Sequence, residues 1–144
     1  MLDIKRLSIE DARLLIKEAV EASNAINVPM CIAVADESGY LIAFERMNGG
    51  KTASISIAMD KAFTAATARR ATHVYNENCV PGKPSYGIHN TNGGRFCIVG
   101  GGLPVTADGV VVGAIGISSG TAAEDQQVGE AALKRFYEAT GYQP

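Results

Sequence analysis

The stretch that decides the fold covers residues 95–130 and reads RFCIVGGGLPVTADGVVVGAIGISSGTAAEDQQVGE. Its apolar residues predict three strands, at Phe96–Val99, through Pro104 and at Val110–Ser118. Glycines follow the first strand and the last one, and a helix then opens with Glu124 and Asp125. Backbone N–H groups at a helix start have no partner inside the helix. The stretch is therefore either a ligand-binding segment that offers free N–H groups or a structural segment whose glycines allow close backbone packing.

The composition is that of an ordinary globular protein. The chain has 144 residues, of which 47% are hydrophobic and 19% are charged, and its formal net charge is -2. We expect one domain over residues 1–144, and the balanced charge argues against a nucleic-acid or membrane-surface partner. The chain opens without a signal-peptide pattern and contains no apolar run long enough to span a membrane. We therefore expect a cytoplasmic protein.

The three cysteines, Cys31, Cys79 and Cys97, lack the spacing of a zinc site or of a disulfide framework. Cys31 and Cys97 fall within apolar runs, which predicts small buried side chains. Cys79 lies in a loop and is the one candidate for a reactive thiol.

The rest of the chain alternates between helical and strand patterns. Ser8 predicts the N-cap of a first helix, which should end shortly before Pro29. A hairpin follows, with apolar runs at residues 30–35 and 40–44. Further helices are predicted from Thr52 to about Arg70 and from about Ala122 to Thr140, with an irregular loop from Cys79 to Gly94 between them. The order α-β-β-α-β-β-β-α predicts an α+β fold, with an antiparallel sheet of about five strands flanked by helices.

Two cations are candidate ligands for an anion. Arg46 ends the second hairpin strand, and Lys61 lies in a helix whose other charged residue over positions 52–68 is Asp60. In a pocket the two cations could hold a carboxylate, which Arg46 could bind in a bidentate manner. The alternative is a surface or interface salt bridge with Glu45 or Asp60.

The glycine segment supplies candidate N–H donors. Gly101, Gly102 and the helix entry after Ser118 could bind a carboxylate or phosphate, or the glycines could simply allow a bulge and a close strand–helix contact. The segment has no cation of its own between Arg95 and Lys134. It is therefore one wall of a site whose charge comes from elsewhere in the chain or from a neighbouring subunit.

Two titratable residues complete the candidate site. His89 lies in a polar, glycine-rich loop, which suits either a general base or metal ligand or a solvated histidine. Asp125 is either an acid of the site or a helix-start residue with local hydrogen bonds. No spacing indicates a nucleophile with its base, so we assign no catalytic residue, and we expect no structural metal site.

Three clusters in this chain carry a family resemblance. They are Asp36-Glu37-Ser38-Gly39-Tyr40-Leu41 with Arg46-Met47, then Lys61-Ala62-Phe63-Thr64-Ala65-Ala66, then Gly101-Gly102-Leu103-Pro104-Val105 with Gly113-Ala114-Ile115-Gly116-Ile117-Ser118 and Asp125. In order and interval they resemble the GlcG/HbpS family, which also occurs as the C-terminal domain of PduO-type proteins. The resemblance implies a profilin-like sandwich, a homo-oligomer and a role near haem or corrinoid cofactors or in small-acid and diol catabolism.

The resemblance favours an accessory protein that binds a small molecule, with haem, cobalamin or a small carboxylic acid as candidate ligands. Haem iron prefers His, Cys, Met or Tyr, and the candidates here are His89, Cys79, Tyr86 and Met47, since the first helix has no histidine. One alternative is an enzyme of small-acid or aldehyde metabolism with His89 or Asp125 as proton carrier, and another is a structural assembly protein. The predicted ligand-binding set is Arg46, Met47, Lys61, His89, Gly101, Gly102, Ser118 and Asp125.

Overall fold

The computed structural model describes all 144 residues and contains three α-helices and one four-stranded sheet. The helices are α1 (Ile9–Ala25), α2 (Ser54–Thr67) and α3 (Ala122–Thr140), and the strands are β1 (Cys31–Asp36), β2 (Leu41–Arg46), β3 (Gly102–Ala107) and β4 (Val110–Ser118). Three short 3-10 segments, η1 (Thr72–Tyr75), η2 (Ile88–Asn90) and η3 (Asn92–Gly94), interrupt the connection between α2 and β3. The sheet is antiparallel in the order β2-β1-β4-β3, which confirms the predicted α+β class.

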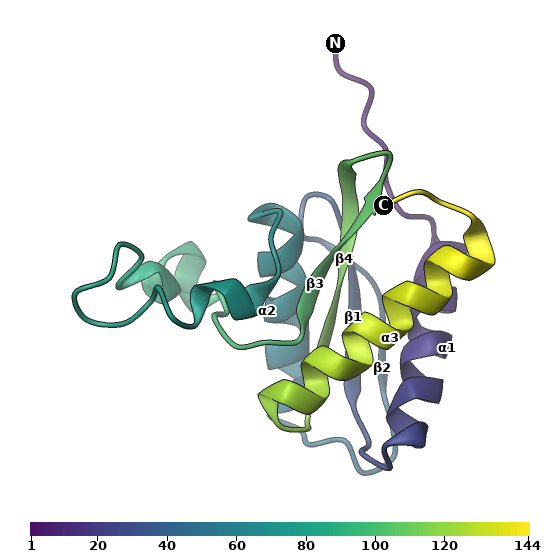
Figure 1. Cartoon of the computed structure of the whole chain (residues 1–144), viewed down its shortest axis with the longest axis horizontal. Coiled ribbons are helices and arrows are strands. Elements are labelled where there is room, and N and C mark those ends of the chain that lie inside the picture. Colours follow the sequence, from purple (N-terminus) through teal and green to yellow (C-terminus); the bar gives the residue numbers. More distant parts are fainter.

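The helices cover both faces of the sheet. Helices α1 and α3 lie side by side on one face, and α2 covers the other (Figure 1). Every residue of β1 is buried, because this central strand has a helix layer on each side. The long connection after α2 projects away from these layers (Figure 1).

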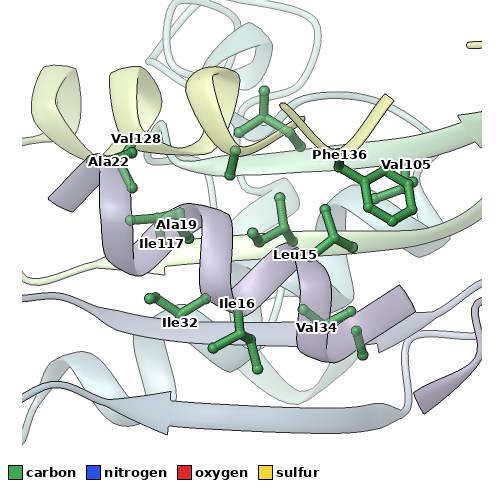
Figure 2. Packing of buried hydrophobic residues seen from close by; sticks show 14 of the residues in the cluster. Leu15, Ile16, Ala19, Ala22, Ile32, Val34, Val105, Ile117, Val128 and Phe136 are labelled. Atoms are coloured by element: carbon green, nitrogen blue, oxygen red, sulfur yellow. The ribbon is translucent and has the colours of Figure 1, made fainter. Parts of the chain in front are cut away.

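The main core lies between the sheet and the α1–α3 pair. In Figure 2, Leu15 and Ala19 of α1 face the strands, and Phe136 of α3 approaches Val105 of β3. All four of these side chains are fully buried. The alternation of side chains along a strand places Ile32 and Val34 in this core and leaves Cys31, Ala33 and Ala35 to face α2.

The contact between α2 and the sheet uses small residues. Ala58 and Ala62 of α2 are fully buried against β1. Gly116 of β4 lies so close to α2 that a methyl group there would overlap the carbonyl oxygen of Ala58 and come within 2.6 Å of the backbone nitrogen of Ala62. The small residues predicted to form this helix are therefore needed for the close approach of helix and sheet.

The predicted strand at Phe96–Val99 is wrong, so the sheet has four strands rather than about five. Side chains of neighbouring elements, not a strand partner, satisfy this backbone. The N–H of Cys97 donates to Thr64 Oγ1 at 2.8 Å, and Thr72 Oγ1 donates to the carbonyl of Val99 at 2.6 Å. Phe96 is buried edge-to-face against Tyr75 at 4.9 Å. The apolar run therefore reflects burial and not a strand.

The helix boundaries follow local capping chemistry. Ser8 Oγ accepts from the N–H of Asp11 at 3.1 Å, as predicted, and Thr121 caps α3 by the same capping box with Glu124. Gly141 ends α3 in the left-handed conformation, with φ of 73°. None of the three helices is both long and apolar enough to cross a bilayer.

Candidate functional site

A buried ion pair joins the two helix layers at the end of β4. Lys61 on α2 is only 1% exposed, and its Nζ donates to Asp125 Oδ2 and to the carbonyl of Ile117, each at 2.8 Å. Asp125 lies in the first turn of α3, and its Oδ1 accepts from the N–H of Gly120 at 2.9 Å. The pair therefore ties α2 to the end of β4 and the start of α3.

The electrostatics of this pair are those of a water-excluded contact. Burial raises the pKa of Asp125 above its ordinary value, while the hydrogen bond and the charge of Lys61 act in the opposite direction. Both carboxylate oxygens accept a hydrogen bond inside the protein, which offsets part of the cost of removing the charges from water. This geometry favours a structural role for Lys61 and Asp125 over direct contact with an anion.

Gly101 and Gly102 lie directly against this pair. Gly101 has φ of 117°, and a side chain there would come within 3.0 Å of Lys61 Nζ. The N–H of Gly101 donates to Gln126 Oε1 at 3.1 Å, and that of Gly102 donates to Thr72 Oγ1 at 3.0 Å. Both predicted N–H donors are thus occupied within the protein, and the close contacts explain why glycine is present.

Arg46, Met47 and Ser118 lie at one end of the sheet. Arg46 and Ser118 are both register partners of Cys31, on opposite sides of β1. Arg46 is exposed and forms no ion pair with Glu45 or any other acid, whereas Asp60 pairs with Arg95 at 3.0 Å. The Met47 sulfur accepts from the N–H of Met30 at 3.3 Å. Met47 is therefore engaged inside the domain.

An open cavity of about 610 Å³ lies between the start of the long connection and the start of α3. Its lining includes His73, Asn76, Asn78, Gly100, Ala122 and Gln126. A side chain at Gly100 would meet His73 Cβ and the carbonyl of Ala122, each at 3.4 Å, so the glycine keeps this wall open. Sequence reasoning missed His73 as a site residue; the one signal available was that it is one of only two histidines in the chain.

His89 lies outside this cavity lining, in η2 of the projecting connection. Its Nδ1 is 3.1 Å from the sulfur of Cys79. The connection leads into β3 at one edge of the sheet, whereas Arg46 ends β2 at the other edge. Arg46, Lys61 and His89 therefore do not line one cavity within a single chain, while Lys61, Asp125, Gly101 and Gly102 do lie together.

These features define a small three-layer α/β/α domain with an open cavity beside a buried ion pair. The family model described as "Haem degrading protein HbpS-like" matches residues 7–134. The chain belongs to this HbpS-like family.

Curated relatives agree with the family match. An uncharacterised 15.0 kDa protein from the dhaT-dhaS intergenic region of Citrobacter freundii is 41% identical over 122 residues, which cover 84% of this chain and 86% of the relative. Protein GlcG of Escherichia coli is 36% identical over 112 residues, covering 78% and 81% of the two chains. Corrinoid adenosyltransferase PduO of Salmonella typhimurium is 31% identical over 127 residues, which cover 88% of this chain and 38% of PduO. The predicted resemblance is thereby confirmed.

Solved structures share the fold over almost the whole chain. The Klebsiella pneumoniae protein ORFY superimposes with a TM-score of 0.92 at 31% identity, covering 94% of each chain. A complex of PduOC with haem gives a TM-score of 0.86 at 30% identity, covering 90% of this chain and 94% of PduOC. A double mutant of Streptomyces reticuli HbpS gives 0.84 at 26% identity, covering 94% and 90%.

Proposed function

We propose that this protein binds haem at the cavity beside His73, as an accessory protein without a catalytic role of its own. The cavity carries the proposal, because a histidine lies at its margin and a helix N-terminus forms one wall. Its volume of about 610 Å³ falls within the roughly 300–1,000 Å³ typical of small-molecule sites. The match to the PduOC–haem complex supports the same ligand class.

Two features of the lining suit haem: an imidazole and the N-terminus of α3. The imidazole of His73 would be a suitable ligand for the iron. Ala122 and Ala123 are the first two residues of α3, so their N–H groups lack helical partners and face an anion favourably. The carboxylates of a bound haem would be favoured at this wall and repelled by Glu77, which also lines the cavity. Haem bound here would supply the redox and ligand-binding chemistry of its iron.

A haemin titration followed by absorbance tests the proposal. Wild-type protein should give a saturable Soret shift, and His73→Ala should weaken binding at least about tenfold because a ligand to the iron is lost. His89→Ala is the matched control, since it removes the chain's other histidine. If His89→Ala alone abolished the shift, the ligand would be on the projecting connection. The absence of any saturable shift would overturn haem binding.

A second variant tests the cavity without altering a histidine. Gly100→Val should narrow the space between His73 and Ala122 and weaken haemin binding. Cobalamin is the competing ligand in the same assay. Saturable binding of cobalamin, with none of haemin, would replace haem by a corrinoid.

The cavity is open to solvent, so a second copy of the chain could complete it, in line with the expected homo-oligomer. Light scattering coupled to gel filtration, with and without haemin, measures the number of chains in the particle. If the monomer bound haemin as tightly as the oligomer, a second copy of the chain would not be needed to complete the site.

A further inference from the structure

Cys79 and His89 form a side-chain pair that the proposed haem site does not use. They are ten residues apart in the sequence, and Cys79 Sγ lies 3.1 Å from His89 Nδ1. Backbone hydrogen bonds from Ser85 to Asn78 at 3.1 Å and from Ile88 to Ser85 at 3.0 Å fold the connection back on itself. The fold of the connection thus brings the imidazole to the sulfur.

The other two cysteines have no such neighbour. Cys31 is fully buried on the central strand, and its Sγ donates to the carbonyl of Lys51 at 3.5 Å. Burial raises the pKa of Cys31 and of Cys97, which disfavours the nucleophilic thiolate at both positions. Cys79 alone has a side-chain base within hydrogen-bond reach, which is the arrangement of an activated nucleophile.

We infer that Cys79 and His89 form a thiol-exchange site that reacts with low-molecular-weight disulfides. His89 Nδ1 takes the thiol proton, and Cys79 Sγ attacks one sulfur of the disulfide. A new S–S bond forms as the old one breaks, and the leaving thiolate takes the proton from the imidazolium. Cys79 is thereby oxidised to a mixed disulfide, and half of the small disulfide is released as a free thiol.

Access to the sulfur is through the connection itself. Cys79 is 6% exposed, but His89 beside it is exposed, and no α-helix or strand lies between η1 and β3. Segments held by isolated turns open locally at much lower free energy than the core. The core need not unfold for a small disulfide to reach Cys79.

Oxidised glutathione is the probe, with intact mass and peptide mapping as the readout on the native chain. Cys79 should acquire glutathione at least about tenfold faster than Cys97, and dithiothreitol should remove it. His89→Asn should slow the reaction of Cys79 by about tenfold or more, because the proton acceptor is lost. Asn90→Ala, in the same 3-10 segment, is the matched control and should leave the rate unchanged.

Two results would overturn the inference: a Cys97 rate equal to or above that of Cys79 in wild-type protein, or an unchanged Cys79 rate in His89→Asn. The first comparison needs no variant, so it holds even if a substitution disturbs folding. His89→Gln, checked by circular dichroism, is the second variant. Haemin is absent from the assay, so failure here and failure of haem binding are separate outcomes.

Discussion

The buried pair Lys61–Asp125 and the projecting pair Cys79–His89 place titratable side chains in opposite settings. Lys61 and Asp125 come from two helices on opposite faces of the sheet and are almost fully buried. Cys79 and His89 come from one irregular segment, and the histidine is exposed. Lys61 and Asp125 connect the layers of the fold, whereas the second pair is held by its own segment alone.

The comparison distinguishes residues that stabilise the fold from residues that are free to take part in chemistry. A buried ion left without its partner is costly, so selection for folding alone is sufficient to retain Lys61 with Asp125. An exposed histidine has no comparable contribution to folding, and substitutions at such positions usually change stability little. Residues of the projecting connection are therefore the better place to seek chemistry, although the sequence made Lys61 and Asp125 look equally suited to a binding site.

The largest expected effect is on the buried pair. Lys61→Met should lower the free energy of unfolding by about 3–5 kcal/mol, because it leaves the carboxylate of Asp125 buried without its cation. His89→Ala should change it by no more than about 0.5 kcal/mol. Urea unfolding followed by circular dichroism measures both values.

A double variant separates loss of the pair from loss of packing. Lys61→Met combined with Asp125→Leu removes both charges and should recover much of the loss, since apolar replacement of a whole buried pair is often tolerated. Recovery should be incomplete, because the N–H of Gly120 then lacks its acceptor. A double variant as unstable as the sum of the two single variants would contradict the comparison.

Much of the fold was predictable from local patterns. The cap at Ser8, the hairpin strands and the last helix through Thr140 follow from capping chemistry and periodicity, which act over a few residues. The prediction of a strand at Phe96–Val99 fails because a buried irregular segment has the same composition as a short strand. Its backbone partners, Thr64 and Thr72, lie about 30 residues earlier in the chain.

The candidate site was predictable only in part. Lys61, Asp125, Gly101 and Gly102 belong to the set predicted to bind a ligand, and the structure places these four close to one another. That Lys61 binds Asp125 rather than an external anion depends on a contact across 64 residues of sequence. No periodicity or spacing encodes such a contact. The cavity at His73 likewise exists only because β3 and α3 begin beside it.

A smaller effect is expected from glycine substitutions in the two regions. Gly116→Ala should lower the free energy of unfolding by about 3 kcal/mol, because the methyl group meets the rigid backbone of Ala58 and Ala62. At Gly87, on the projecting connection, an added methyl group would meet no other atom. Gly87→Ala should therefore lower the free energy of unfolding by only about 1 kcal/mol, from the strain of a φ of 88°. Thermal unfolding of both variants measures the two losses of stability. A greater loss of stability for Gly87→Ala than for Gly116→Ala would contradict the prediction.

The smallest effect is expected from an exposed ion pair, the surface counterpart of Lys61–Asp125. Arg6 contacts Glu37 at 2.8 Å and lowers the pKa of Glu37 to about 2 through a hydrogen bond. Since the folded state holds this carboxylate ionised below its ordinary pKa of 4.5, stability from the pair is present above that pH and is lost as the pH falls towards about 2. Glu37→Gln should flatten this part of the stability–pH curve. Arg6 is 55% exposed at its side chain, so the change should be smaller than that from Gly116→Ala. The free energy of unfolding in urea should be measured for both proteins between pH 4.5 and pH 2. If its dependence on pH were the same in Glu37→Gln as in wild-type protein, water would already screen this pair, as it cannot for Lys61 and Asp125.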